Sequence, residues 1–273
     1  MSRPSGPWPG GAAGAIGLSF DNLGEAAEIE LGALAPDAPL GGHFSATRAV
    51  PAILEALASR GLTATFFVEG LNAEAYPDLL AAIDAAGHEV AYHAWRHEQW
   101  GRLSAGAQAE NLARGVAAFE RLGLTVSGMR PPGGELGPGG IELLRDAGLS
   151  YCSPVGGGIG APEGDFALLP FEWRNVDASC VLPELGPSRE PAQFLADLEA
   201  ELERLGREGG HLALVLHPFM LDWLGEDSLA AIFDRLREGA ARGELWPARC
   251  RDVAEHVLAH REAFGDGASL SAP

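Results

Sequence analysis

The amino-acid sequence predicts an α/β protein, a distorted barrel of about seven parallel strands with helices between them. Short apolar runs alternate along the chain with longer stretches of helical apolar spacing. The 273 residues, 47% of them apolar, are enough to bury a sizeable core. No change of composition marks a linker, so we expect one barrel domain.

The expected strands are short apolar runs, and they lie at residues 15–20, 64–68, 89–92, 126–129, 149–152, 167–169 and 212–216. A helical stretch between successive runs favours parallel strands joined by right-handed crossovers. In such a barrel the chemistry lies at the carboxyl ends of the strands.

The expected helices are stretches whose apolar residues share one face, as Val50, Ile53, Leu54 and Leu57 do. They lie at residues 47–60, 77–86, 104–122, 140–147, 191–208, 228–242 and 251–264. Glycine follows several of them, as is common where a helix ends.

The two ends of the chain differ from the barrel domain, which we place at residues 15–264. Residues 1–14 are rich in Gly and Pro and are expected to form a flexible arm rather than a signal peptide. Residues 265–273 are expected to be a disordered tail. No stretch approaches the ~20 apolar residues of a membrane span, so we expect a cytoplasmic protein.

Composition excludes several classes of function. The formal charge of −19 makes nucleic acid and membrane surfaces poor partners, so a small-molecule substrate is expected. The absence of lysine excludes a Schiff-base lysine, a pyridoxal phosphate anchor and a P-loop. The three cysteines are scattered and suit a reducing compartment. Self-association stays open, because Trp8, Trp223 and Trp246 suit an interface or a core equally.

Four polar residues directly follow an apolar run: Asp21, His93, Arg130 and His217. If the strands are parallel neighbours, these side chains converge on one rim of the barrel. Asp21 is then a general base or a helix N-cap, and Arg130 keeps that carboxylate ionised or forms an ordinary buried ion pair. His217 is a proton-transfer group or a core histidine.

His93 and His97 are four residues apart, so on a helical turn their imidazoles share a face and can bind one metal ion. The same spacing recurs at His256 and His260 in the amphipathic C-terminal helix. There we expect only a solvated face, so the spacing alone is weak evidence.

The remaining candidates concern substrate binding. Pro131, Pro132 and Gly133 form a stiff loop over the rim or a plain turn. Trp173 and Asp177 provide an aromatic wall for a sugar-like substrate and a carboxylate that orients His217. The alternative is a core tryptophan and a surface aspartate.

Taken in order, five segments resemble the NodB-type polysaccharide deacetylases, in particular the cytoplasmic peptidoglycan-deacetylase-like and allantoinase-like imide-hydrolase branch. The segments are SFDN at 19–22, LTATFFVEG at 62–70, AGHEVAYHAWRHE at 86–98, MRPPGG at 129–134 and LVLHP at 214–218. The histidine segment is the most specific of them, and the likeness extends over about residues 15–258.

The resemblance implies a distorted (β/α) barrel and a hydrolase acting on an amide C–N bond. It implies that Asp21 is the base, that Arg130 positions Asp21, and that His217 is the acid. Asp177 would orient His217.

The resemblance also implies a divalent metal, usually zinc, held by His93, His97 and the residue at or near Asn22. That position is usually a carboxylate, whereas Asn22 offers only a neutral amide oxygen. Zinc is then held more weakly, unless Glu25 replaces it or Asp21 becomes a ligand.

Three functions therefore stay open. The first is metal-assisted N-deacetylation of an amino-sugar-containing or related small molecule. The second is metal-independent opening of a cyclic imide or ureide, and the third is a catalytically inactive barrel that binds a ligand.

Overall fold

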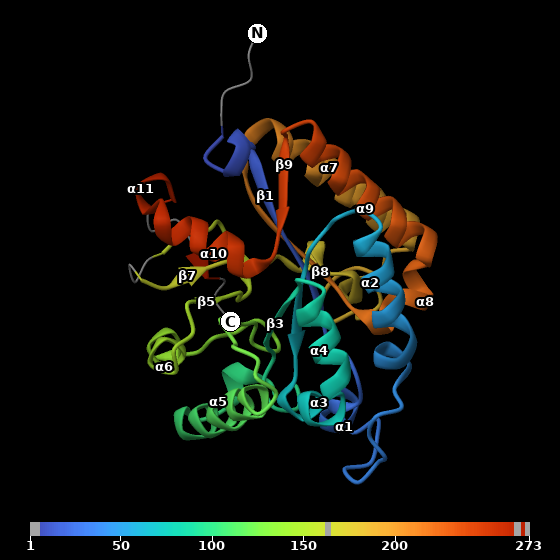
Figure 1. The fold of residues 1–273 in the computed structure, drawn as a ribbon, viewed down its shortest axis with the longest axis vertical. Coiled ribbons are helices and arrows are strands. Elements are labelled where there is room, and N and C mark those ends of the chain that lie inside the picture. The colour runs from blue at the N-terminus through green and yellow to red at the C-terminus, as the bar shows by residue number, and fades with distance from the viewer. Residues whose placement is uncertain (1–5, 162–164, 265–268, 271–273) are drawn as a thin grey trace.

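The structure, a computed structural model, describes residues 6–161, 165–264 and 269–270. Figure 1 shows a curled sheet with most of the helices around its outer side. Within the described residues the main sheet has eight strands, and its neighbouring strands pair in parallel. The predicted distorted (β/α) barrel is confirmed.

The sheet contains every strand that the apolar runs predicted. Its order is β7 (Ala167–Leu168), β5 (Tyr151–Cys152), β4 (Gly128–Met129), β3 (Glu89–Tyr92), β2 (Thr65–Val68), β1 (Gly14–Asp21) and β8 (Gly210–Leu216). An unexpected strand, β9 (Leu245–Ala248), pairs with the first half of β1. β9 contains Pro247, which lacks an N–H group, and it pairs with β1 alone among the described strands. Proline is tolerated at such an edge.

The predicted helices are also present, joined by the short helices α1, α3 and α8, which the apolar spacing did not indicate. In chain order they are α1 (Ala26–Glu30), α2 (Val50–Ala58), α3 (Gly70–Ala75), α4 (Pro77–Ala85), α5 (Ala105–Glu120), α6 (Gly140–Asp146), α7 (Pro191–Glu208), α8 (Leu221–Leu224), α9 (Glu226–Ala241), α10 (Cys250–Ala259) and α11 (Arg261–Phe264). Every helix in the described part of the chain is too short or too polar to cross a lipid bilayer.

The C-terminal helix predicted at 251–264 is two helices, α10 and α11. The chain leaves helical geometry at His260, which has φ −127° and ψ 41°. The first turn of α10 is capped from inside the barrel. The Cys250 N–H donates to Thr65 Oγ1 at 2.7 Å and the Arg251 N–H donates to Glu89 Oε2 at 2.9 Å. These side chains satisfy amide groups that a helix leaves free at its start.

The N-terminal arm is packed, not free, where the structure describes it. Trp8 is 2% exposed, and its ring centroid lies 5.9 Å from that of Trp246 and 4.7 Å from that of Phe264. Burial of the indole packs this part of the expected arm against Trp246 of β9 and Phe264 of α11. Residues 1–5 lie outside the described residues.

The predicted disordered tail lies mostly outside the described residues, at 265–268 and 271–273. Between these stretches, β10 (Ser269–Leu270) pairs antiparallel with β6 (Gly156–Gly157). Two residues of the expected tail therefore belong to a small second sheet.

The sheet register brings the carboxyl ends of the strands to one level. Asp21, the last residue of β1, pairs with Phe67 of β2, and the preceding Phe20 pairs with Leu216 of β8. His217, the residue after Leu216, therefore lies level with Asp21. The polar residues that follow β3 and β4 lie on the same rim.

Helix α5 packs closely on β3, and we use this contact to test the packing. A methyl group at Gly115 would lie 2.1 Å from the Tyr92 ring. We expect Gly115→Ala to lower the free energy of unfolding by about 1–3 kcal/mol, because the buried tyrosine has to move. Gly106→Ala is the control within the same helix, since a methyl group there has no heavy atom within 4 Å. Urea unfolding should show a loss for Gly115→Ala alone; equal stability of both variants would contradict the packing.

Candidate active site

A buried ion pair lies at the centre of the rim. Arg130 is 1% exposed and Asp21 is 4% exposed, and Arg130 Nη1 donates to Asp21 Oδ1 at 2.6 Å. The guanidinium lies over the Phe67 ring at 4.2 Å and the Phe171 ring at 5.4 Å. The structure thus brings together the carboxylate and the cation that the sequence placed after separate strands. The pair leaves Asp21 Oδ2 directed toward His93.

Two serines that the sequence analysis missed also bind Arg130. Ser19 Oγ accepts from Arg130 Nη1 at 2.8 Å, and Ser153 Oγ accepts from Nε at 3.2 Å and from Nη2 at 3.0 Å. The signal was available: Ser19 is two residues before Asp21, on the same side of β1, and Ser153 directly follows β5.

His93 lies between the ion pair and His97, the second histidine expected to bind a metal. Its Nδ1–H donates to the Arg130 carbonyl oxygen at 2.7 Å, which leaves Nε2 facing Asp21 Oδ2 at 4.0 Å. The ring centroid of His97 lies 5.0 Å from that of His93. Burial lowers the pKa of each imidazole to about 3. Both rings are therefore neutral at physiological pH, the form that binds metals.

The two histidines do not lie on a helical turn, so that expectation was wrong. The chain passes through left-handed geometry at Ala94, with φ 63°, and at His97, with φ 74°. A tight turn brings the rings together, and it costs backbone strain in residues that have a Cβ atom. Such strain is concentrated at functional sites.

His217 and Asp177 form the second ion pair of the site. Asp177 Oδ1 lies 2.6 Å from His217 Nδ1, and Asp177 Oδ2 accepts from the His217 backbone N–H at 2.8 Å. Burial by itself lowers the pKa of His217, but the charge of Asp177 and its hydrogen bond outweigh burial, so the pKa is raised. The Phe219 ring covers the imidazole at a centroid distance of 4.9 Å. Asp177, 1% exposed, is not a surface residue.

Asn22 lies in left-handed geometry, with φ 58°, directly after Asp21. Its side-chain oxygen is buried and has no hydrogen-bond partner among the described residues. Glu25 does not replace it, because both oxygens are engaged elsewhere. Oε1 accepts from the N–H groups of Gly42 and His43 at 3.0 Å, and Oε2 accepts from the Tyr76 hydroxyl at 2.7 Å.

These donors fit a weakly held divalent ion. His93, His97 and Asn22 offer neutral nitrogen and oxygen atoms, and the Asn22 oxygen is unpartnered. The nearest carboxylate, Asp21, is bound to Arg130. In the described part of the chain no group of three or more His, Cys, Asp or Glu side chains is placed to hold a metal ion. A metal here would gain little charge neutralisation from its ligands.

The expected substrate-binding residues lie in the loop that follows Arg130 and beside Phe171, whose ring faces the Arg130 guanidinium. Trp173, partly exposed, meets Phe171 edge-on at a centroid distance of 5.0 Å. The Pro132 carbonyl accepts from the Trp100 N–H at 3.3 Å, which fixes the loop after Arg130. Gly133 in that loop has φ 79°. Pro131 and Pro132 are themselves buried, so they shape the loop.

Glu69, directly after β2, is a further residue that the sequence analysis missed. The same rule that selected Asp21 and His93, a polar residue at a strand end, would have found it. Glu69 is fully buried, and its Oε2 accepts from Asn72 Nδ2 at 2.9 Å, whereas Oε1 has no partner among the described residues. Burial raises the pKa of Glu69 to about 8, and the charge of Asp21 adds to this rise.

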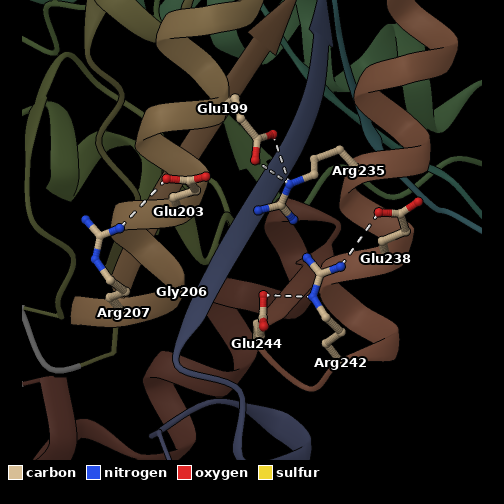
Figure 2. A pocket seen from close by; sticks show the side chains of 8 residues that line it. All are labelled: Glu199, Glu203, Gly206, Arg207, Arg235, Glu238, Arg242 and Glu244. Carbon is tan, nitrogen blue, oxygen red and sulfur yellow. Dashed lines mark hydrogen bonds and ion pairs between the residues drawn. The ribbon is translucent and has the colours of Figure 1, made fainter.

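A separate surface cleft of about 460 Å³ lies between α7 and α9 and contains none of these residues. Figure 2 shows that its glutamates and arginines pair with one another, and that the Arg235–Glu199 pair joins α9 to α7. Arg235 binds Glu199 at 2.8 Å, and Arg242 binds Glu244 at 3.1 Å. These charges are thus already paired, and we assign no ligand to this cleft.

Comparison with known proteins places the chain among deacetylases. A family model described as polysaccharide deacetylase matches residues 15–152, half of the chain. A chitin deacetylase from Pestalotiopsis sp. is 33% identical over 103 residues, which are 36% of this chain and 34% of that protein. The match thus spans about a third of that curated relative.

Solved structures resemble the whole barrel. A proposed polysaccharide deacetylase from Mycobacterium smegmatis has a TM-score of 0.81 and 27% identity, covering 100% of this chain and 98% of that one. The allantoinase Puue has a TM-score of 0.76 and 20% identity, covering 95% of each chain. The second likeness shows the fold alone.

Glu69 should make the stability of the protein depend on pH. Its pKa is about 8 in the folded chain against an ordinary 4.5, so folding binds a proton between these values. Relative to Glu69→Gln, the wild-type protein should lose stability as pH rises from about 4.5 to 8, by at most about 1.4 kcal/mol per pH unit. Urea unfolding of both proteins across this range tests the prediction, and parallel stability curves would contradict it.

Proposed function

Because the chain belongs to the polysaccharide deacetylase family, we propose that it is a hydrolase that cleaves an amide C–N bond. The observation that carries this proposal is the placement of two ion pairs at one rim. Asp21 lies beside Arg130, and His217 lies beside Asp177. Amide hydrolysis needs a base to activate water and an acid to protonate the leaving nitrogen.

Asp21 is the base in this proposal. The guanidinium of Arg130 fixes one oxygen of the Asp21 carboxylate, while the second oxygen is free to accept a proton from water. Because Asp21 is 4% exposed, water must approach it from the rim.

His217 is the acid. The raised pKa of His217 favours its protonated form. Asp177 fixes Nδ1, so Nε2 carries the proton that passes to the leaving nitrogen. The neutral His93 and His97 are unsuited to this role, since the pKa of each is about 3.

A divalent metal, zinc being the first candidate, would be held by His93, His97 and Asn22 and would polarise the substrate carbonyl. The substrate proposed is an N-acylated amino-sugar-containing or related small molecule, with Trp173 as an apolar wall. The cysteines of the described residues are buried and free, which supports a cytoplasmic enzyme.

Opening of a cyclic imide or ureide without metal is the second candidate. Two observations favour it: the metal-ligand candidates include no carboxylate, and the barrel resembles that of an allantoinase. Both reactions use the same base and acid on an amide bond, so they differ in the substrate and in the need for metal. A catalytically inactive barrel would hydrolyse neither kind of substrate.

His217→Ala tests the proposed reaction. On whichever of N-acetyl, N-formyl and cyclic-imide probes the wild-type protein hydrolyses, kcat should fall by about 10² to 10⁴, because the leaving nitrogen loses its acid. His260→Ala, an exposed histidine of the C-terminal segment, is the control and should keep its kcat. A normal kcat for His217→Ala would rule out the acid role.

Asn22→Asp tests the metal site. The added negative charge should raise zinc affinity by about tenfold or more, measured as bound metal per chain after equilibrium dialysis. His97→Ala serves as the opposite control and should lose bound zinc. If Asn22→Asp and the wild-type protein bind equal zinc, Asn22 does not lie at a metal.

A further inference from the structure

Arg130 is deeply buried, yet most of its side-chain partners among the described residues carry no negative charge. A guanidinium has two edges, each able to bind a carboxylate through two parallel hydrogen bonds. In the described residues one carboxylate, Asp21, binds Arg130, and it uses Nη1. The Nε–Nη2 edge binds the single hydroxyl of Ser153, at 3.2 and 3.0 Å.

A guanidinium edge bound by a single neutral hydroxyl is unusual for an arginine that is buried. Arg130 is 1% exposed, and Ser153 and Ser19 are fully buried, so water does not stabilise the charge. Arginines this deep are normally paired. Here two hydroxyls and two aromatic faces surround the cation, and among the described residues Asp21 is the one carboxylate that binds it.

The serines are themselves fixed in place. Ser19 Oγ donates to the Leu214 carbonyl at 3.0 Å, so its lone pairs face Arg130. The Ser153 backbone N–H donates to the carbonyl of Met129, the last residue of β4, at 2.8 Å, and so ties Ser153 to the strand that Arg130 directly follows. The guanidinium plane is therefore set from both sides by groups without charge.

We infer that Ser153 is a positioning residue that holds the Nε–Nη2 edge of Arg130 without adding negative charge, so that the whole guanidinium charge acts on Asp21. The inference rests on the proposed function for its catalytic meaning. A carboxylate at position 153 would bind that edge in the bidentate geometry that arginine favours. It would draw the guanidinium from Asp21 and repel the Asp21 carboxylate.

Two variants of equal size separate charge from shape. Ser153→Asn keeps an acceptor and adds no charge, whereas Ser153→Asp adds a charge to nearly the same atoms. On an N-acetyl probe that the wild-type protein hydrolyses, kcat of Ser153→Asp should be at least about tenfold below that of Ser153→Asn, with similar KM. A purely structural role predicts the opposite order, because the aspartate forms the stronger bond with Arg130. Equal kcat values, or the higher kcat for Ser153→Asp, would overturn the inference.

Ser153→Ala provides a test if the buried position accommodates neither asparagine nor aspartate. It should lower kcat by about tenfold through loss of the bond to Arg130. Ser150 directly precedes β5, the strand that Ser153 follows. Ser150→Ala removes a hydrogen bond of 3.2 Å to the Ser127 carbonyl and should leave kcat unchanged. Equal effects of the two alanine variants on kcat would mean that Ser153 acts only through stability.

A crystal structure of each variant tests the inference without any substrate. Arg130 Nη1 should remain at hydrogen-bond distance from Asp21 Oδ1 in Ser153→Asn and should leave it in Ser153→Asp. An intact Arg130–Asp21 bond in Ser153→Asp would overturn the inference even if catalysis were lost. A wild-type protein that hydrolyses no amide probe would instead reject the proposed function, and the structures would still decide the role of Ser153.

Discussion

The hydrogen-bonded ion pair between Asp21 and Arg130 is the interaction on which the site depends. Both groups lie where water is almost excluded, so neither charge would be tolerated there without the other. The backbone carbonyl of Arg130 also accepts from His93, so the same residue orients the Asp21 carboxylate through its side chain and an imidazole through its main chain. Removing Arg130 would therefore disturb both halves of the rim.

The turn after Asp21 is held by the neighbouring segments rather than by its own sequence. The Gly24 N–H donates to Ser45 Oγ at 2.8 Å, and Asn72 donates to both the Leu23 carbonyl and Glu69. In the described part of the chain, the residues other than glycine with positive φ are Asn22, Ala94 and His97, and all three lie at this rim. The barrel thus stores its backbone strain around the ion pair, a pattern typical of functional sites.

The histidines of the site also differ in the protonation state that their surroundings favour. Burial lowers the pKa of His93 and His97 to about 3, whereas Asp177 raises the pKa of His217. The surroundings therefore favour the protonated form of one imidazole at the rim and the neutral form of the other two, which is the division that the proposed roles require. The difference comes from one aspartate, Asp177, in the segment between β7 and α7.

The sequence by itself determined seven of the eight strands of the main sheet, most helices and the residues that end those strands, because apolar periodicity is a local property of the chain. It also indicated Asp21, His93, Arg130 and His217 as neighbours, since parallel strands end at one rim. The non-helical turn at His97, the engagement of Glu25 by loop amides and the serine contacts of Arg130 were decided only by the tertiary structure. Each depends on segments far apart in the chain, such as residues 19, 130 and 153, whose side chains meet only when the sheet has curled. Burial, and with it the pKa of every histidine at the rim, arises only from that packing.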